Sequence, residues 1–155
     1  MELFVRVDDR LLHGRVICAW VPFVKADLLI VVSDEAATDS LRVAVMEACA
    51  DDGLKVIVRS VQDIVSGDYG GNSGEDGRGM LVVGSLKDAM RLYEGGFRFS
   101  SLNIGNVHHG DGGRKISLSV ILNGEDEKLM ERFESLGVKI DVRDVPTAEP
   151  VPHKK

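Results

Sequence analysis

The run LLIVV at residues 28–32 is apolar at every position, so a strand made from it must be covered on both faces. Similar short runs rich in valine, isoleucine and leucine recur along the chain, with stretches of helical period between them. This alternation is typical of parallel βαβ units. We therefore predict an α/β fold, a single domain with a mostly parallel central sheet of about seven strands and helices on both faces. The strands are expected at Leu3–Val7, Leu28–Val32, Lys55–Arg59, Met80–Val83, Ser101–Ile104, Ile116–Val120 and Lys139–Val142.

Helix starts are marked by a capping residue that is followed three positions later by an acidic residue. This pattern occurs at Ser60, Ser85 and Asn123. Gly95 and Gly137 follow two of the helical stretches and are expected to end them.

Two segments lack the pattern of a packed element. The stretch Gly67–Gly79 (GDYGGNSGEDGRG) is polar and rich in glycine, and is expected to form a mobile surface loop. Residues 146–155 contain three prolines and are expected to form an extended, disordered tail after a domain at residues 1–145. Cys18 and Cys49 stand among apolar neighbours and are expected to be small buried residues, in neither a disulfide nor a zinc site.

Composition excludes several classes of function. The chain has 155 residues, 44% of them hydrophobic, and 25 acidic against 19 basic residues give a formal charge of −6. No basic face for general nucleic-acid binding is implied by this balance. The start MELFVRVDDR has no secretion signal, and no apolar run is long enough to span a membrane, so we expect a cytoplasmic protein.

Polar residues follow several of the predicted strands. In an open parallel sheet, ligands bind outside the carboxyl ends of the strands, where we expect a crevice. Its predicted lining consists of Asp8, Ser33, Asp34, Asn106, His108 and His109. His108 and His109 either form a second site in this crevice or are a pair of solvated loop residues.

His13 is the most distinctive residue at this edge, because it precedes a helical pattern that runs from Val16 to Val24. Unpaired amides and the positive end of a helix dipole stabilise a phosphoryl group attached at such a position.

Neighbouring residues suit the same chemistry. Arg10 and Arg15 can hold phosphate oxygens through two parallel hydrogen bonds, and the backbone at Leu12 and Gly14 completes the predicted phosphate site. Asp8 or Asp9 can accept a ring N–H of His13 and fix its tautomer, and of the two we place Asp9 in the catalytic set. The spacing alone also fits a plain surface pair of histidine and arginine.

The segment VRVDDRLLHGRV, Val5–Val16, resembles the phosphorylation motif of the enzyme IIB component of the mannose/fructose/sorbose family of the bacterial phosphotransferase system. Further collinear matches are Trp20, VVSDEAATDSLR, SLKDAMRLYEGG, SLNIGNVHH and LGVKIDVRDVP, which together cover nearly the whole chain. Departures from the family are Arg15 where glutamine is common, Ser33 where asparagine is common and Asn106 where glycine is common.

This resemblance implies a cytoplasmic phosphoryl carrier, a transferase that works at the inner face of the membrane. His13, on an exposed loop after the first strand, would accept phosphate from a phosphohistidine of a IIA protein. It would pass the phosphate to a sugar held by membrane IIC and IID subunits. Arg10 matches the family arginine that binds the phosphoryl group, and neither a metal nor another cofactor is implied.

Two alternatives use the same residues. One is a regulatory module that takes phosphate from the IIA donor but has no sugar acceptor of its own. The other is a non-catalytic binder of a small anion or a metal that relies on His108 and His109. The sequence has no HExxH-type spacing of metal ligands, which argues against the hypothesis that the protein binds a metal.

Overall fold

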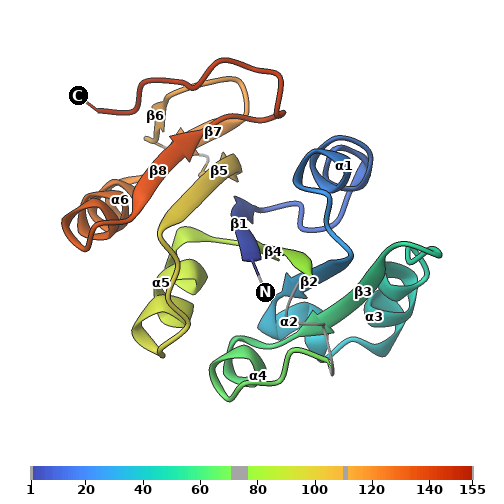
Figure 1. Cartoon of the computed structure of the whole chain (residues 1–155). Coiled ribbons are helices and arrows are strands. Elements are labelled where there is room, and N and C mark those ends of the chain that lie inside the picture. The colour runs from blue at the N-terminus through green and yellow to red at the C-terminus, as the bar shows by residue number, and fades with distance from the viewer. Residues whose placement is uncertain (1, 71–76, 110–111, 155) are drawn as a thin grey trace.

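The computed structural model describes residues 2–70, 77–109 and 112–154 (Figure 1). Its strands are β1 (Glu2–Asp8), β2 (Leu28–Val32), β3 (Lys55–Arg59), β4 (Arg78–Val83), β5 (Ser101–His108), β6 (Arg114–Lys115), β7 (Val120–Leu122) and β8 (Lys139–Val142). Its helices are η1 (Val16–Trp20, a π-helical turn), α1 (Val21–Val24), α2 (Asp34–Ala37), α3 (Ser40–Glu47), α4 (Val61–Val65), α5 (Leu86–Glu94) and α6 (Gly124–Ser135).

The strands form one sheet in the order β3-β2-β4-β1-β5-β7-β6, and β8 also pairs with β5. Among these strands only β6 and β7 pair antiparallel. Along its outer edge, β5 pairs with β8 through residues 101–104 and with β7 through residues 107–108. The predicted α/β fold with a mostly parallel sheet is therefore confirmed.

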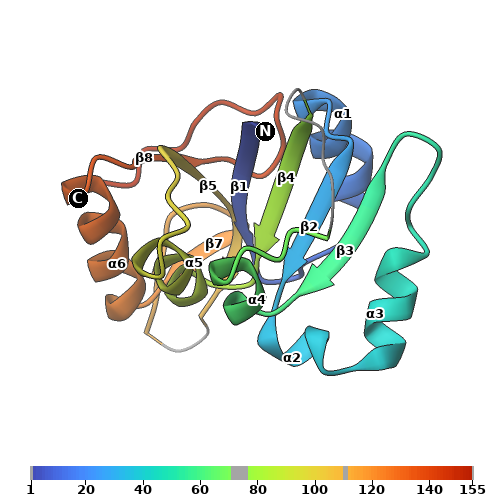
Figure 2. The same cartoon turned by 60° about the horizontal axis from the view of Figure 1, so that its bottom comes forward.

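Helices cover both faces of the sheet, as the two-sided apolar strands require. Leu28, Ile30 and Val32 of β2 pack into the core cluster that contains α4, α5 and α6. Leu29 and Val31 point the other way, into the cluster that contains η1, α1 and α2. Figures 1 and 2 show these two layers on opposite sides of the strands.

The central strand β1 carries this alternation to the functional end of the molecule. Val5 and Val7 are buried on the α5 side, whereas Phe4 packs on the opposite side against Trp20 of η1. Positions 6 and 8 share the η1 side, so Arg6 and Asp8 are buried there, both at 0% exposure. A buried ion pair on a central strand thus lies directly under the loop that carries His13.

The helix caps follow the predicted pattern. Ser60, Ser85 and Asn123 are the N-cap residues of α4, α5 and α6, and each side-chain oxygen accepts an amide three residues on. Gly137, with φ of 85°, lies two residues beyond the end of α6.

The sixth predicted strand is wrong. Residues 116–119 form a turn between β6 and β7, in which the amides of Ile116 and Ser117 both donate to the carbonyl of Val120. Leu118 is 89% exposed, so the alternation in ISLSV does not mark a half-buried strand. In contrast, β5 extends to His108, four residues beyond its predicted end at Ile104.

Other expectations also need correction. Cys18 and Cys49 are exposed: Cys18 lies on the solvent side of η1, and Cys49 lies in the turn after α3. The tail is extended but anchored, since the Val151 amide donates to the Val142 carbonyl at 2.8 Å. Of the predicted Gly67–Gly79 loop, residues 71–76 lie outside the described residues, and the last two residues belong to β4.

Candidate active site

His13 lies between the end of β1 and the helix that follows. Residues 14–24 are helical through η1 and α1, and the His13 carbonyl accepts the amides of Val16 and Ile17 at 3.1 and 3.2 Å. His13 is therefore at the N-terminal cap, next to the first amides of the helix. The preceding loop contains Leu11, whose φ of 57° is unusual for a branched residue and whose side chain is buried.

The His13 ring is held through one nitrogen. Its Nε2 lies 2.7 Å from Oδ2 of Asp8. A carboxylate only accepts hydrogen bonds, so the proton belongs on Nε2 and the lone pair on Nδ1. Nδ1 is buried and has no hydrogen-bond partner within the described part of the chain. The side chain is only 9% exposed, so the ring is more buried than the expected position on an exposed loop implies.

Asp8 is the centre of the cluster beneath the ring. Its Oδ2 accepts hydrogen bonds from Nε and Nη2 of Arg6 at 3.2 and 3.1 Å and from Nδ2 of Asn106 at 3.2 Å. Its Oδ1 accepts the backbone amide of Arg10 at 3.0 Å. These donors fix the orientation of the carboxylate that faces His13.

The neighbouring Asp9 does not reach the ring. Its Oδ2 accepts the backbone amide of His108 at 2.9 Å and lies 3.0 Å from Nδ1 of the same residue. Side chains alternate along a strand, so Asp8 and Asp9 point to different sides at the end of β1. Asp8 is thus the partner of His13, and the choice of Asp9 for this contact is wrong.

Arg6 ties the cluster to the rest of the sheet. Its Nη1 donates to Oδ1 of Asn103 at 2.7 Å, and its guanidinium carbon lies 4.9 Å from the centre of the Trp20 ring. Burial lowers the pKa of Arg6 from its ordinary value, and the Asp8 carboxylate opposes this effect. Trp20 is itself a core residue, stacked on Phe4.

The predicted phosphate-binding residues lie around the mouth of this cluster. Arg10 is exposed, and in the described residues its guanidinium has no partner. Arg15 is half exposed and pairs through Nη1 with Oδ2 of Asp144. A Cβ added at Gly14 would meet nothing within 4 Å, so there is open space beside His13. The side chain of Leu12 packs against the η1 core, which leaves only its backbone for a ligand.

The two neighbouring histidines have different partners. His108 is fixed to Asp9 and therefore lies beside the His13 loop. His109 pairs through Nδ1 with Asp126, a buried residue of the α6 capping box. They do not form one site together, although both rings are about half exposed, at 44% and 42%.

Ser33 and Asp34 have structural contacts of their own. Ser33 caps α2 by accepting the amide of Ala36 at 3.1 Å. Asp34 accepts the amide of Val61 at 2.9 Å and forms an ion pair with Arg91 at 2.9 Å. Neither is part of the cluster around His13.

Sequence reasoning missed three residues of the cluster: Arg6, Asn103 and Asp144. Arg6 and Asn103 each stand between two apolar residues of a strand, and a charged or amide residue at such a position is a signal of a buried polar network. Asp144 lies just after β8, so the same search at strand ends would have found it.

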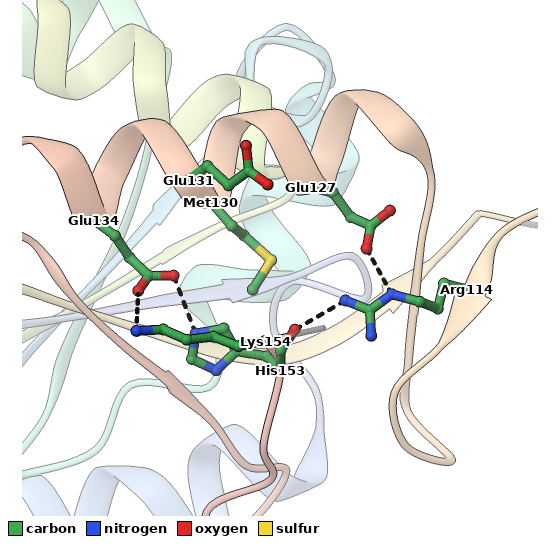
Figure 3. A pocket seen from close by; sticks show the side chains of 7 residues that line it. All are labelled: Arg114, Glu127, Met130, Glu131, Glu134, His153 and Lys154. Carbon is green, nitrogen blue, oxygen red and sulfur yellow. Dashed lines mark hydrogen bonds and ion pairs between the residues drawn. The ribbon is translucent and has the colours of Figure 1, made fainter.

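A cavity of about 400 Å³ lies elsewhere, between α6 and the tail (Figure 3). Its lining consists of Arg114, Glu127, Met130, Glu131, Glu134, His153 and Lys154. Ion pairs cross it, because Glu134 contacts both His153 and Lys154, and Arg114 contacts Glu127. Within residues 2–70, 77–109 and 112–154, no three histidine, cysteine or acidic side chains are grouped to hold a metal ion.

Residues 2–155 match the family described as PTS system sorbose subfamily IIB component. The chain belongs to this family. It is 30% identical over 142 residues to the N-acetylgalactosamine-specific phosphotransferase enzyme IIB component 2 of Escherichia coli, covering 92% of this chain and 89% of that protein. It is 32% identical to the sorbose-specific EIIB component of Lacticaseibacillus casei, covering 92% and 86% of the two chains.

Solved structures of IIB components have the same fold. The IIB domain of the sorbose permease from Klebsiella pneumoniae superimposes with a TM-score of 0.86 at 28% identity, covering 97% of this chain and 93% of that one. The N-acetylgalactosamine-specific IIB component 1 of Escherichia coli gives a TM-score of 0.87 at 26% identity, covering 98% of both chains.

As a IIB component, the protein is a phosphotransferase subunit of a sugar phosphotransferase system. Such components work with IIA proteins and with membrane IIC and IID subunits. Among the described residues, no helix has both the length and the apolar character needed to cross a membrane.

Proposed function

We propose that this IIB component carries the phosphoryl group on Nδ1 of His13. The observation that carries the proposal is the asymmetry of the ring: Nε2 is hydrogen-bonded to Asp8, whereas Nδ1 has no partner among the residues that the structure describes. A neutral imidazole with its lone pair on Nδ1 is a nucleophile at that atom. Because Nδ1 is covered, the ring or the loop above it must move before a donor phosphorus can reach it.

The donor is a phosphohistidine of a IIA protein. In an in-line displacement, the Nδ1 lone pair forms the new N–P bond while the N–P bond of the donor breaks and returns its electron pair to the donor ring. The proton on Nε2 stays in place, so the phosphorylated ring is cationic and is stabilised by the Asp8 carboxylate at 2.7 Å.

The arriving phosphoryl group is stabilised by two features. The first amides of the helix after His13 and the positive end of its dipole face the group. The exposed guanidinium of Arg10 has N–H groups that can donate hydrogen bonds to phosphate oxygens. The backbone amide of Arg10 donates to Asp8, which fixes the position of the loop. The protein thus positions the reacting groups and stabilises the negative charge of the phosphoryl group, as phosphoryl transfer requires.

The acceptor is a sugar bound by membrane IIC and IID subunits. The relatives have names that specify N-acetylgalactosamine, sorbose, fructose or mannose, which supports a hexose or a hexose derivative as the substrate class. A protein that meets two macromolecular partners in turn must expose His13 to each of them. The cavity in Figure 3 is not lined by any residue of the His13 cluster.

The test is phosphorylation from phosphoenolpyruvate with enzyme I, the phosphocarrier protein and a matching IIA, followed by intact-mass measurement at alkaline pH. The proposal predicts one acid-labile phosphate on the wild type and none on His13→Ala. Phosphate on both proteins, or on neither with a donor that labels another IIB component, would refute it.

A further inference from the structure

Asp144 joins the C-terminal segment to the His13 cluster through contacts of three of its oxygen atoms. Its backbone carbonyl accepts Nε1 of Trp20 at 2.7 Å. Its Oδ1 accepts Nδ2 of Asn106 at 3.3 Å and lies 3.6 Å from Nη2 of Arg6. Its Oδ2 pairs with Nη1 of Arg15. No other carboxylate among the described residues connects Arg15 to this cluster.

These contacts lead directly to the phosphorylated residue of the proposed function. The amide of Asn106 donates to Asp144 and also to Oδ2 of Asp8, which holds the His13 ring. Arg15 lies two residues after His13, in the first turn of the helix that His13 caps. The guanidinium of Arg15 therefore belongs to the rim of the site, although its present partner is Asp144.

The two members of this ion pair differ in exposure and in the number of their contacts. The Arg15 side chain is 52% exposed, and among the described residues only Asp144 holds it. The Asp144 side chain is 25% exposed and has inner contacts. Arg15 can therefore leave while Asp144 stays. A phosphoryl group on His13 would bring up to two negative charges near Arg15, more than the single charge of a carboxylate.

We propose that Asp144 is a positioning residue that holds Arg15 at the rim of the unphosphorylated site and competes with the phosphoryl group for it. This inference rests on the proposed function. The competition makes Arg15 a weaker ligand for phosphate than a free arginine is. Phospho-His13 is thereby kept less stable, so that its phosphoryl group is more readily passed on.

The experiment measures the equilibrium constant for transfer from phosphorylated IIA to this protein. Asp144→Asn removes the competing charge but keeps an amide oxygen for Asn106, so it should raise the constant about two- to fivefold, the range of an exposed ion pair. Arg15→Gln should lower it by a similar factor. In the Arg15→Gln background, Asp144→Asn should lose most of its effect, because there is no arginine left to release.

Two controls separate this role from general charge or folding effects. Asp144→Glu keeps the competing carboxylate and should restore a constant near that of the wild type. Glu94→Gln and Arg132→Gln break an ion pair of similar exposure elsewhere, with a 2.8 Å contact, and should leave the constant unchanged.

An equal rise on Asp144→Asn with and without Arg15 would overturn the proposal, because Asp144 would then act only by repelling phosphate. No rise in either background would overturn it too. Failure of the wild type to take phosphate on His13 would instead refute the proposed function, so the two failures are distinguishable.

Discussion

At the scale of single residues, the ring of His13 is controlled from inside the sheet. Asp8 fixes Nε2, and Arg6 and Asn106 fix Asp8. The exposed residues of the loop contribute charge, whereas the buried ones decide which ring nitrogen is free. Changes at the two adjacent aspartates should therefore have unequal effects.

We expect Asp8→Asn to slow phosphorylation of His13 by at least about tenfold, because the ring loses the carboxylate that fixes its tautomer and stabilises its charge. Asp9→Asn, the matched control, should change the rate less than about threefold, since Asp9 contacts His108 and not the ring of His13. Single-turnover transfer from phosphorylated IIA measures both. Equal losses in the two variants would contradict the geometry described for Asp8.

Arg10→Lys should reduce the rate of transfer without abolishing it. Lysine keeps the positive charge but loses the planar fork that holds two phosphate oxygens at once. The same single-turnover measurement applies, and an unchanged rate would remove Arg10 from the site.

The space for Arg6 depends on a single glycine of β5. A Cβ at Gly105 would lie 2.0 Å from the Arg6 guanidinium, which is fully buried and has nowhere to move. Gly105→Ala should lower the free energy of unfolding by about 1–3 kcal/mol, as overpacking does. Gly124→Ala, where the added Cβ meets nothing within 4 Å, is the control and should be nearly neutral in a urea titration. A neutral Gly105→Ala would show that Arg6 is less confined than described.

At the scale of elements, Asp34 connects three helices and does not line the predicted crevice. It lies at the start of α2, accepts the first amide of α4 and pairs with Arg91 of α5. The hydrogen bond from the Val61 amide lowers the pKa of Asp34, and Arg91 adds to this effect. A carboxyl whose pKa is lower in the folded protein stabilises it above the unfolded pKa, and this contribution is lost as the pH falls through the folded value.

Asp34→Asn should therefore lower stability near neutral pH by no more than about 1 kcal/mol, since both partners are half exposed to solvent. The difference from the wild type should shrink as the pH falls below about 4, near the ordinary pKa of aspartate. Urea titrations at several pH values measure it. Transfer to His13 should be unchanged, and a tenfold loss of transfer would place Asp34 in the site after all.

Sequence patterns predicted those elements whose signals are local. The apolar runs of β2, β3 and β8 gave their observed bounds, and the caps at Ser60, Ser85 and Asn123 mark real helix starts. The alternation in ISLSV predicts a strand where the β6–β7 turn lies, and this prediction is wrong because Leu118 is exposed. The predicted end of β5 is four residues too early, because Asn106 is polar but is buried in the cluster.

For the site, too, only contacts between residues close in sequence could be predicted. His13 and Asp8 are five residues apart, so one motif contains both. Asn103 and Asp144 reach the cluster from β5 and from the end of β8, more than ninety residues along the chain from Asp8. Such contacts depend on strand order and register, which no local pattern reveals.

At the scale of the whole molecule, the C-terminal segment packs against the domain and is held by several contacts. Val151 packs against the core, Arg114 donates to the carbonyl of His153 at 2.8 Å, and His153 Nε2 lies 3.1 Å from Glu134. Asp144, earlier in the same segment, has its own contacts with the cluster.

Removal of residues 151–155 should therefore destabilise the fold by about 2–4 kcal/mol, the sum expected for the hydrogen bonds of Val151 and His153 and a partly buried valine. The rate of His13 phosphorylation should remain near that of the full chain at a temperature where both are folded. Thermal unfolding and single-turnover transfer measure the two quantities, and a large loss of transfer would show that the tail contributes to the site.

Nitrogen NMR of the phosphorylated protein, labelled with ¹⁵N at histidine, is the direct test of whether Nδ1 of His13 carries the phosphoryl group. We expect one phosphorylated imidazole, assigned to His13 by its absence in His13→Ala, with the N–P coupling at Nδ1 and the proton retained at Nε2. Coupling at Nε2, or a phosphorylated ring that persists in His13→Ala and maps to His108 or His109, would contradict it.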